Sequence, residues 1–374
     1  MSILIGADLV PTKSNINLFM EANTNELLDS DLRELLNKAD YRIFNLEVPL
    51  TDNPSPIQKN GPCLIAPSKC IEGYKAMGVD LLTLANNHIL DQGFDGFYST
   101  IELCKKYNIS IVGAGENIEA ACKPFIFTNN NKRIGVYACA EHEYSIATEK
   151  TPGANPVDLL EISDHISNLK KQCDYMIVLY HGGKEHYRYP SPGLQKVCRK
   201  LVEKGADLVI CQHSHCIGCE EKYLQGTIVY GQGNFLFDRN NSEYWKTSLL
   251  IYIHDDESIE YIPIVKNGHT VRLADCLEKD DILSSFSRRN KEITKKGFVE
   301  KAFMDYSRYM SGFYFMTVSG IGDKLLLRII NKLSGDRFFD WYLNRKYTKQ
   351  KRIQLENIIE CEAHVELFLN LLRQ

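Results

Sequence analysis

Short apolar runs of strand length recur along the first 265 residues, and segments with apolar residues at helical spacing separate them. Runs that are apolar at nearly every position predict strands buried on both faces of a mostly parallel sheet. The pattern predicts strands at residues 2–7, 41–46, 81–85, 109–113, 125–128, 133–139, 174–180, 206–211, 226–230, 247–253 and 259–265. It predicts helices at residues 23–39, 68–77, 94–107, 155–171 and 193–204. This alternation indicates an α/β fold.

Parts of this region depart from the regular alternation of strand and helix. Asn129-Asn-Asn131 lies between two predicted strands and is typical of a tight hairpin. The strands at 247–253 and 259–265 are expected to form a closing antiparallel pair. Residues 51–67 are rich in Pro, Asn and Gly and are too long for a simple connection. We therefore expect this loop to form a lip of a substrate site.

The last part of the chain has a different pattern. From about Asp280 onward, strand signals become rare and apolar residues follow helical spacing. Residues 1–278 contain 26 Lys and Arg against 36 Asp and Glu, a net charge of −10, whereas residues 279–374 contain 18 against 12, a net of +6. We expect an α/β domain at 1–278 and a basic, mostly helical region at 279–374. The basic region could dock an anionic partner, or its charges could simply solvate the helices.

Composition and cysteine usage bear on the compartment. The 12 cysteines show no regular pairing, and several lie in apolar segments, as is usual for buried thiols in a reducing environment. The N-terminal run lacks the basic segment of a signal peptide and is interpreted as a core strand. No apolar stretch is long enough to span a membrane. These observations predict a cytoplasmic protein without a transmembrane segment.

Polar residues stand where the predicted parallel strands end. Because open α/β sheets bind ligands outside the carboxyl ends of their strands, we expect these side chains to meet at one edge. His213 and His215 alternate on backbone that we expect to be extended, so their rings would point to the same side. The set, in chain order, is Asp8, Glu47, Asn87, His181, His213 and His215.

These residue types point to a metal site. Carboxylate, amide and imidazole ligands suit Mn²⁺, Fe²⁺ or Zn²⁺, and six ligands fit a pair of ions that share a carboxylate better than one tetrahedral zinc. Asp8 or Glu47 alone could instead cap a helix, and His181, which precedes two glycines, could be a turn residue. Recurrence at successive strand ends favours two divalent metal ions.

A second candidate follows the strand at 81–85. Imidazole is a common general acid or base in enzymes, and Asp91 is close enough in sequence to hold the ring of His88, so the two are a candidate catalytic pair. Alternatively, this segment is a polar turn in which Asn86 and Asn87 cap the helix that begins near Phe94.

Several of these motifs together resemble a known family. Asp8, Asn45-Leu-Glu47, Ala85-Asn-Asn-His88, His181-Gly and His213-Ser-His215, with Gly231-Gln-Gly-Asn-Phe235 after them, occur in an order and spacing similar to the CapA family of capsule-synthesis proteins. That family is related to the calcineurin-like metallophosphoesterases. The resemblance covers roughly residues 1–265.

The resemblance implies a fold and a metal centre. The expected fold is a four-layer α/β/β/α sandwich of the metallophosphatase type, with the helical region appended. Asp8, Glu47 and His215 would bind one ion, and Glu47 would bridge to a second ion that is also held by three further ligands: Asn87, His181 and His213. His88, oriented by Asp91, would be the general acid. Substrate would be bound by Asn86, Lys59 and Arg188.

The implied function is metal-dependent hydrolysis of a phosphate ester in the synthesis of capsule, polysaccharide or poly-γ-glutamate. Two alternatives remain open: hydrolysis or transfer at a γ-glutamyl amide, and a non-enzymatic role in assembling a polymer synthase. The expected partners are an anionic small molecule or polymer and other capsule-synthesis proteins, and no nucleic acid. The sequence does not specify an oligomer.

Overall fold

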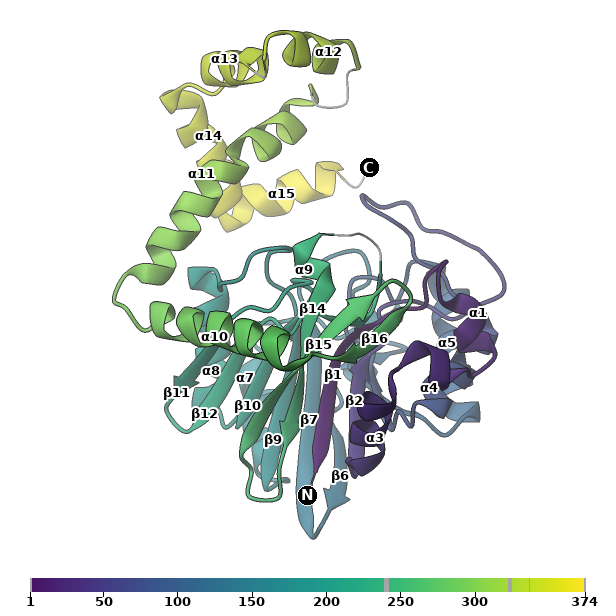
Figure 1. The fold of residues 1–374 in the computed structure, drawn as a ribbon. Helices are drawn as coiled ribbons and strands as arrows, with labels where there is room; N and C mark the ends of the chain where they lie inside the picture. Colours follow the sequence, from purple (N-terminus) through teal and green to yellow (C-terminus); the bar gives the residue numbers. More distant parts are fainter. Residues whose placement is uncertain (1, 239–241, 322–324, 336, 373–374) are drawn as a thin grey trace. The chain divides into compact units, whose positions relative to one another are not determined.

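The computed structural model describes residues 2–238, 242–321, 325–335 and 337–372 (Figure 1). The chain forms two compact units, Met1–Glu300 and Lys301–Gln374. The boundary predicted from composition, after residue 278, falls inside helix α10 (Cys276–Ile293) of the first unit.

The first sheet contains eight strands in the order β16-β15-β14-β1-β2-β3-β4, and β13 pairs with β1. The neighbours β1, β2, β3 and β4 are parallel, whereas β14, β15 and β16 are antiparallel. Its strands are β1 (Ile3–Leu9), β2 (Tyr41–Asn45), β3 (Leu81–Thr83), β4 (Ser110–Val112), β13 (Asn234–Leu236), β14 (Thr247–Ile253), β15 (Ile259–Asn267) and β16 (Thr270–Leu273).

The second sheet contains six strands in the order β11-β12-β10-β9-β7-β6. Its centre, β7, β9, β10 and β12, is parallel, and antiparallel strands β6 and β11 close the two edges. Its strands are β6 (Phe125–Asn129), β7 (Lys132–Ala140), β9 (Tyr175–His181), β10 (Leu208–Gln212), β11 (Glu220–Tyr223) and β12 (Gly226–Tyr230). A separate two-stranded ribbon pairs β5 (Ala114–Gly115) with β8 (Gly153–Ala154).

The two sheets pack face to face and share one core. Alternate residues of β9 show this directly, since Ile177 and Leu179 belong to the cluster that also contains β1 and β2, whereas Met176 and Val178 contact the helices. Both faces of the strand are therefore buried, which explains why the sequence of β9 is continuously apolar. The stacked rings of Tyr41 and Phe127, 3.8 Å apart, join β2 to β6 across the interface.

Helices cover the outer faces and complete four layers (Figure 1). Helices α7 (Ile162–Lys170) and α8 (Pro192–Glu203) cover the second sheet, and α3 (Ser30–Lys38), α4 (Ile71–Ala76) and α5 (Gly93–Lys106) lie beside the first. Helix α10 packs its buried Ile282 and Phe286 against Leu249 of β14. The other helices of this unit are α1 (Ile16–Met20), α2 (Thr24–Leu27), α6 (Ile118–Ala121) and α9 (Glu243–Lys246). The predicted α/β/β/α sandwich is confirmed.

Most predicted elements are present, and the differences occur where local pattern competes with long-range pairing. The hairpin at Asn129-Asn-Asn131 and the antiparallel pair β14–β15 are confirmed. The expected helix at 155–171 begins only at Ile162, and the segment 23–39 is two helices, α2 and α3. Strands β11, β13 and β16 were not predicted. Of these, β13 forms by pairing with β1, a contact between distant parts of the chain.

The second unit is helical, as predicted. Its helices are α11 (Phe298–Ser319), which begins in the first unit, α12 (Leu325–Leu333), α13 (Arg337–Lys346), α14 (Lys349–Glu360) and α15 (Glu362–Leu372). A small core forms from Ile321, Phe339, Leu343 and Tyr347.

The segment after β10 packs closely on the end of β12. Gly218 donates its backbone N–H to Gly231 O at 3.0 Å, and a Cβ at this position would lie only 1.8 Å from Tyr230 O. Only glycine permits this approach. The contact fixes the exit of a segment that carries His213 and His215.

We expect Gly218→Ala to reduce the free energy of unfolding by about 1–3 kcal/mol, because the added methyl group overlaps backbone that cannot easily move. Gly193→Ala is the matched control, since its nearest contact would lie at 3.8 Å. Thermal unfolding followed by circular dichroism measures both. Equal unfolding midpoints for the two variants would contradict the close packing of this loop.

Candidate metal centre

The carboxyl ends of both sheets meet at the predicted site. Asp8 lies near the end of β1, Glu47 follows β2, and Asn87 follows β3 in the first sheet. In the second sheet, His181 ends β9 and His213 follows β10. The parallel strands of the two sheets therefore supply ligand candidates from opposite sides of one space.

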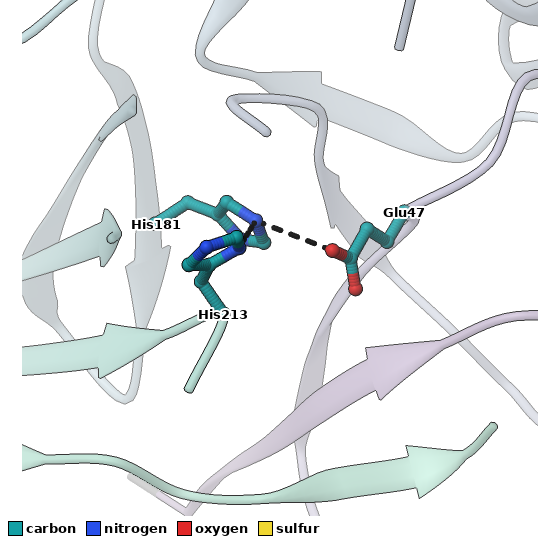
Figure 2. A group of neighbouring side chains, drawn as sticks. All are labelled: Glu47, His181 and His213. Carbon is teal, nitrogen blue, oxygen red and sulfur yellow. Dashed lines mark hydrogen bonds and ion pairs between the residues drawn. The ribbon is translucent and has the colours of Figure 1, made fainter. Parts of the chain in front are cut away.

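Their donor atoms form two overlapping groups. Glu47, His181 and His213 each offer an atom within 4.8 Å of the others, and so do Asp8, Glu47 and His215. Figure 2 shows the first group, in which His181 Nε2 lies 3.3 Å from Glu47 Oε1 and 3.2 Å from His213 Nδ1. In the second group, His215 Nδ1 lies 3.5 Å from Asp8 Oδ2. Glu47 belongs to both groups, as a bridging carboxylate would.

The carboxylates at this junction are buried without sufficient hydrogen bonds. Glu47 is 0% exposed, and neither of its carboxylate oxygens accepts a hydrogen bond from any residue that the structure describes, although His181 Nε2 is near. Asp8 is also fully buried, and its Oδ2 lacks a hydrogen bond. Removing a carboxylate from water costs several kcal/mol unless a cation compensates for it. The donor set and its unsatisfied oxygens thus fit a divalent cation.

Proton affinities in the cluster are coupled to these charges. Burial opposes the charged form of Asp8, but the nearby imidazoles of His215 and His181 outweigh it and lower the pKa of the carboxyl group. Burial also disfavours protonated His215, yet Asp8 and Glu47 raise its pKa to about 9. Burial, followed by the charges of neighbouring histidines, holds the pKa of His213 well below its usual value. A metal ion would have to displace the proton from His215.

The two histidines after β10 converge for a different reason from the predicted one. We expected extended backbone, but His213 has φ 78° and His215 has φ 53°, both in the left-handed region. Their ring centroids are nevertheless 5.9 Å apart. A tight left-handed turn, and not strand alternation, brings these rings together, and such a turn is uncommon for residues other than glycine.

The side-chain amides of Asn87 and Asn86 lie in different surroundings, one beside the cluster and one in a separate hydrogen-bond network. Asn87 Oδ1 lies 3.0 Å from His181 Nε2, beside the first group. Asn86 is fully buried, where its Nδ2 donates to Asn45 Oδ1 at 3.1 Å and to Leu46 O at 2.8 Å, and its Oδ1 accepts from the backbone N–H of His88 at 3.1 Å. The structure thus puts Asn86 in a network that holds the segment after β3.

His88 and Asp91 form the predicted pair, and Lys59 joins them. His88 Nδ1 lies 2.5 Å from Asp91 Oδ2, and Lys59 Nζ donates to Asp91 Oδ1 at 2.7 Å. Lys59 also donates to Asn87 O at 3.1 Å, and its side chain is only 2% exposed. Leu64 N donates to Asp91 Oδ2 at 2.6 Å. The loop at 51–67 is therefore attached to the segment that carries His88, and the ammonium group expected to bind substrate lies in a buried ion pair.

Arg188 lies next to helix α9 and the segment after β10. Its Nη1 donates to Ile217 O at 2.9 Å, and its guanidinium group stacks on the Tyr244 ring at 4.8 Å. Its Nη2 lies 3.5 Å from Glu243 Oε1. The structure therefore places Arg188 with α9 and the segment after β10, and not among the two groups that could hold a metal ion.

Three supporting residues were not assigned a role from the sequence. Asn45 Nδ2 donates to Asp8 Oδ1 at 2.8 Å, and Asn234 Oδ1 lies 2.8 Å from His215 Nδ1. Trp245 stacks on His215 with centroids 4.4 Å apart. Asn45 and Asn234 belong to motifs that the sequence analysis named, so their place near the strand ends could be predicted. Their hydrogen-bond partners could not, because these depend on the pairing of β1 with β2 and β13.

This four-layer α/β/β/α sandwich, with a buried Asp, Glu and His cluster at the strand ends, defines an α/β protein with a candidate metal site. The family model described as "Bacterial capsule synthesis protein PGA_cap" matches residues 7–239. The chain belongs to this family, and the predicted resemblance to CapA proteins is confirmed.

Two relatives are similar to this chain over part of its length. Capsule biosynthesis protein CapA of Bacillus anthracis is 30% identical over 267 residues, which are 68% of this chain and 65% of that protein. PGA biosynthesis protein CapA of Bacillus subtilis (strain 168) is 28% identical over 223 residues, 58% of each chain. The match thus spans about three fifths of the length of these two relatives.

Solved structures with a similar arrangement include a phosphatase from Mycoplasma pneumoniae. The two chains are 16% identical, the match covers 71% of this chain and 94% of the phosphatase, and the TM-score is 0.44.

Among the described residues, no helix is both long and apolar enough to cross a membrane.

We expect Glu47→Gln and His213→Ala each to remove most of the bound metal, because a shared carboxylate and a directly ligating imidazole cannot be replaced without loss of charge or geometry. Elemental analysis of the purified protein measures this. Glu203→Gln and His165→Ala, which lie outside the cluster, are the controls. Full metal occupancy in both test variants would show that these residues are not ligands.

Metal binding should also strengthen as the pH rises from 6 toward 9. The folded protein without metal holds a proton on His215 up to its pKa of about 9, so protons compete with the metal at lower pH. Metal titrations at constant ionic strength across this range give the apparent affinity. An affinity independent of pH would contradict the participation of His215.

Proposed function

We propose that this chain binds two divalent metal ions at the strand ends and hydrolyses a phosphate ester. The observation that carries the proposal is Glu47, a fully buried carboxylate that belongs to both donor groups and accepts no hydrogen bond within the described parts of the chain. A single carboxylate in this position can bridge two ions, and a polar cluster this costly to bury is difficult to explain as part of a core.

The ligands divide between two positions. Asp8, Glu47 and His215 would hold one ion. Glu47, His181 and His213 would hold the other, with the amide oxygen of Asn87 as a further ligand. Oxygen and imidazole donors suit Mn²⁺, Fe²⁺ or Zn²⁺, and the site contains no thiolate to favour softer ions.

The residues around the metals have separate roles in the proposed reaction. When bound, two ions would lower the pKa of a water molecule and neutralise the phosphoryl oxygens. Asp91 holds the His88 ring through Nδ1, which leaves Nε2 to give a proton to the leaving oxygen. Lys59 balances the charge of Asp91 and fixes its second oxygen, so the carboxylate cannot turn away from His88.

The family gives the proposed reaction its context. The relatives are described as capsule and PGA biosynthesis proteins, which supports a substrate in the synthesis of an extracellular polymer. The same names are also consistent with a second candidate reaction, hydrolysis or transfer at a γ-glutamyl amide. In that reaction the ions would polarise the carbonyl oxygen of the amide instead of a phosphate.

All twelve cysteines are free thiols, which supports the cytoplasm as the compartment.

We expect the full-length, metal-loaded protein to hydrolyse a generic aryl phosphate, and His88→Ala to lower kcat by about 10²–10⁴-fold, the usual contribution of a general acid. The metal content of the variant should be unchanged. His165→Ala, whose ring contacts Tyr137 on another face, is the control.

The outcomes separate the candidate functions. Turnover of γ-glutamyl amides without turnover of phosphates would favour the amide reaction. A fully metal-loaded protein inactive on both substrate classes would overturn the enzymatic proposal and favour a role in assembly.

A further inference from the structure

A second polar cavity of about 430 Å³ lies between α10, α9 and the segment after β9. Four basic side chains line it, against two acidic ones, so its charge is distinctly positive. The basic residues are Arg188, Lys246, Arg288 and Arg289, and the acidic residues are Glu243 and Asp281. This cavity is lined by none of the residues of the two donor groups.

Arg289 is the unusual member of this set. It is only 6% exposed, and its one hydrogen bond with the described residues runs from Nε to Gly218 O at 2.6 Å. It forms no ion pair with any carboxylate in the described parts of the chain. Its two terminal nitrogens, which carry most of the donors of a guanidinium group, therefore have no hydrogen-bond partner among the described residues. Buried arginines are normally paired.

A second arginine increases the local charge. Arg188 lines the same cavity with a side chain that is 24% exposed, and its closest carboxylate, Glu243, is 76% exposed at 3.5 Å. An exposed carboxylate at that distance compensates only weakly. Burial, followed by the charge of Arg188, lowers the pKa of Arg289. Two guanidinium groups thus repel each other at the cavity wall, and an anion between them would remove the repulsion.

We propose that this cavity is a second anion-binding site, in which Arg289 and Arg188 bind the oxygens of a phosphate or carboxylate group. The planar guanidinium group binds both oxyanions through paired hydrogen bonds. Lys246 and Arg288, both exposed, supply further positive charge at the rim. Either group would suit a family whose relatives act in capsule and PGA biosynthesis, but the site does not depend on the proposed hydrolysis.

The short helix α9 separates this cavity from the metal centre. Trp245 stacks on His215, whereas Glu243 and Lys246 of the same helix line the cavity. Tyr244 lies between the Arg188 guanidinium and the His186 ring, with centroids 5.3 Å from His186. A molecule with two anionic groups could therefore be held on both sides of one helix, and an anion bound at Arg188 would also order the wall behind His215.

The test is calorimetric titration of the full-length protein with inorganic phosphate and, separately, with γ-linked triglutamate at constant ionic strength. Phosphate bound at the metal centre contributes equally to every variant, so differences isolate the second site. Arg188→Gln should weaken binding of one ligand by about 10- to 100-fold, the usual effect of losing a charged hydrogen bond. Arg133→Gln, at an exposed position near the start of β7, is the matched control. The affected ligand identifies the source of the oxyanion.

A measurement on the wild-type protein tests the same site without the risk that a substitution disturbs folding. Phosphate or triglutamate should shield Arg188 from phenylglyoxal, an arginine-specific reagent, and should leave Arg133 reactive, as read by peptide mass spectrometry. The metal content of Arg188→Gln should equal that of the wild type, which separates this site from the metal centre. Unchanged titrations for both ligands, together with no protection of Arg188, would overturn the proposal.

Discussion

A carboxylate without hydrogen bonds at the junction of two sheets is the constraint on which the site depends. Glu47 stands where the first sheet ends, and the histidines that approach it come from the second. Neither sheet alone could build the cluster, and the cluster is favourable only if positive charge enters it. The packing of the sheets, which also creates the core, therefore sets the spacing of the donors.

The region around this cluster is held by hydrogen bonds that reach across strands and loops. Asn45 links Asp8 to Asn86, and Asn86 in turn fixes the backbone of His88. The irregular loop at 51–67 is attached through Lys59 and Leu64 to Asp91. A loop of this length would ordinarily be mobile, but its attachment to a buried carboxylate restricts it. The position of His88 and the conformation of the loop thus depend on the same side chain, Asp91.

The sequence indicated the strands, their polar ends and the helical region because each is a local pattern. The six ligand candidates could be selected since parallel strands expose their carboxyl ends at one edge. The features that the sequence did not indicate depend on pairing between distant segments of the chain. Strand β13 exists because it pairs with β1, and only that pairing brings Asn234 to His215. Likewise, Lys59 reaches its polar partners only when its loop folds over Asp91. The sequence pattern around Lys59 therefore did not predict that its side chain is buried.

The left-handed backbone at His213 and His215 has a consequence for how this site could change during evolution. Among residues with ligating side chains, asparagine and aspartate tolerate this conformation best. A single replacement of either histidine by one of them would keep the turn and exchange a nitrogen donor for oxygen. The metal preference of the site would then move toward harder ions such as Mn²⁺ or Mg²⁺, while the strands around it stay in place. The backbone of one short turn thus limits which donor atoms this part of the cluster could offer to a metal ion.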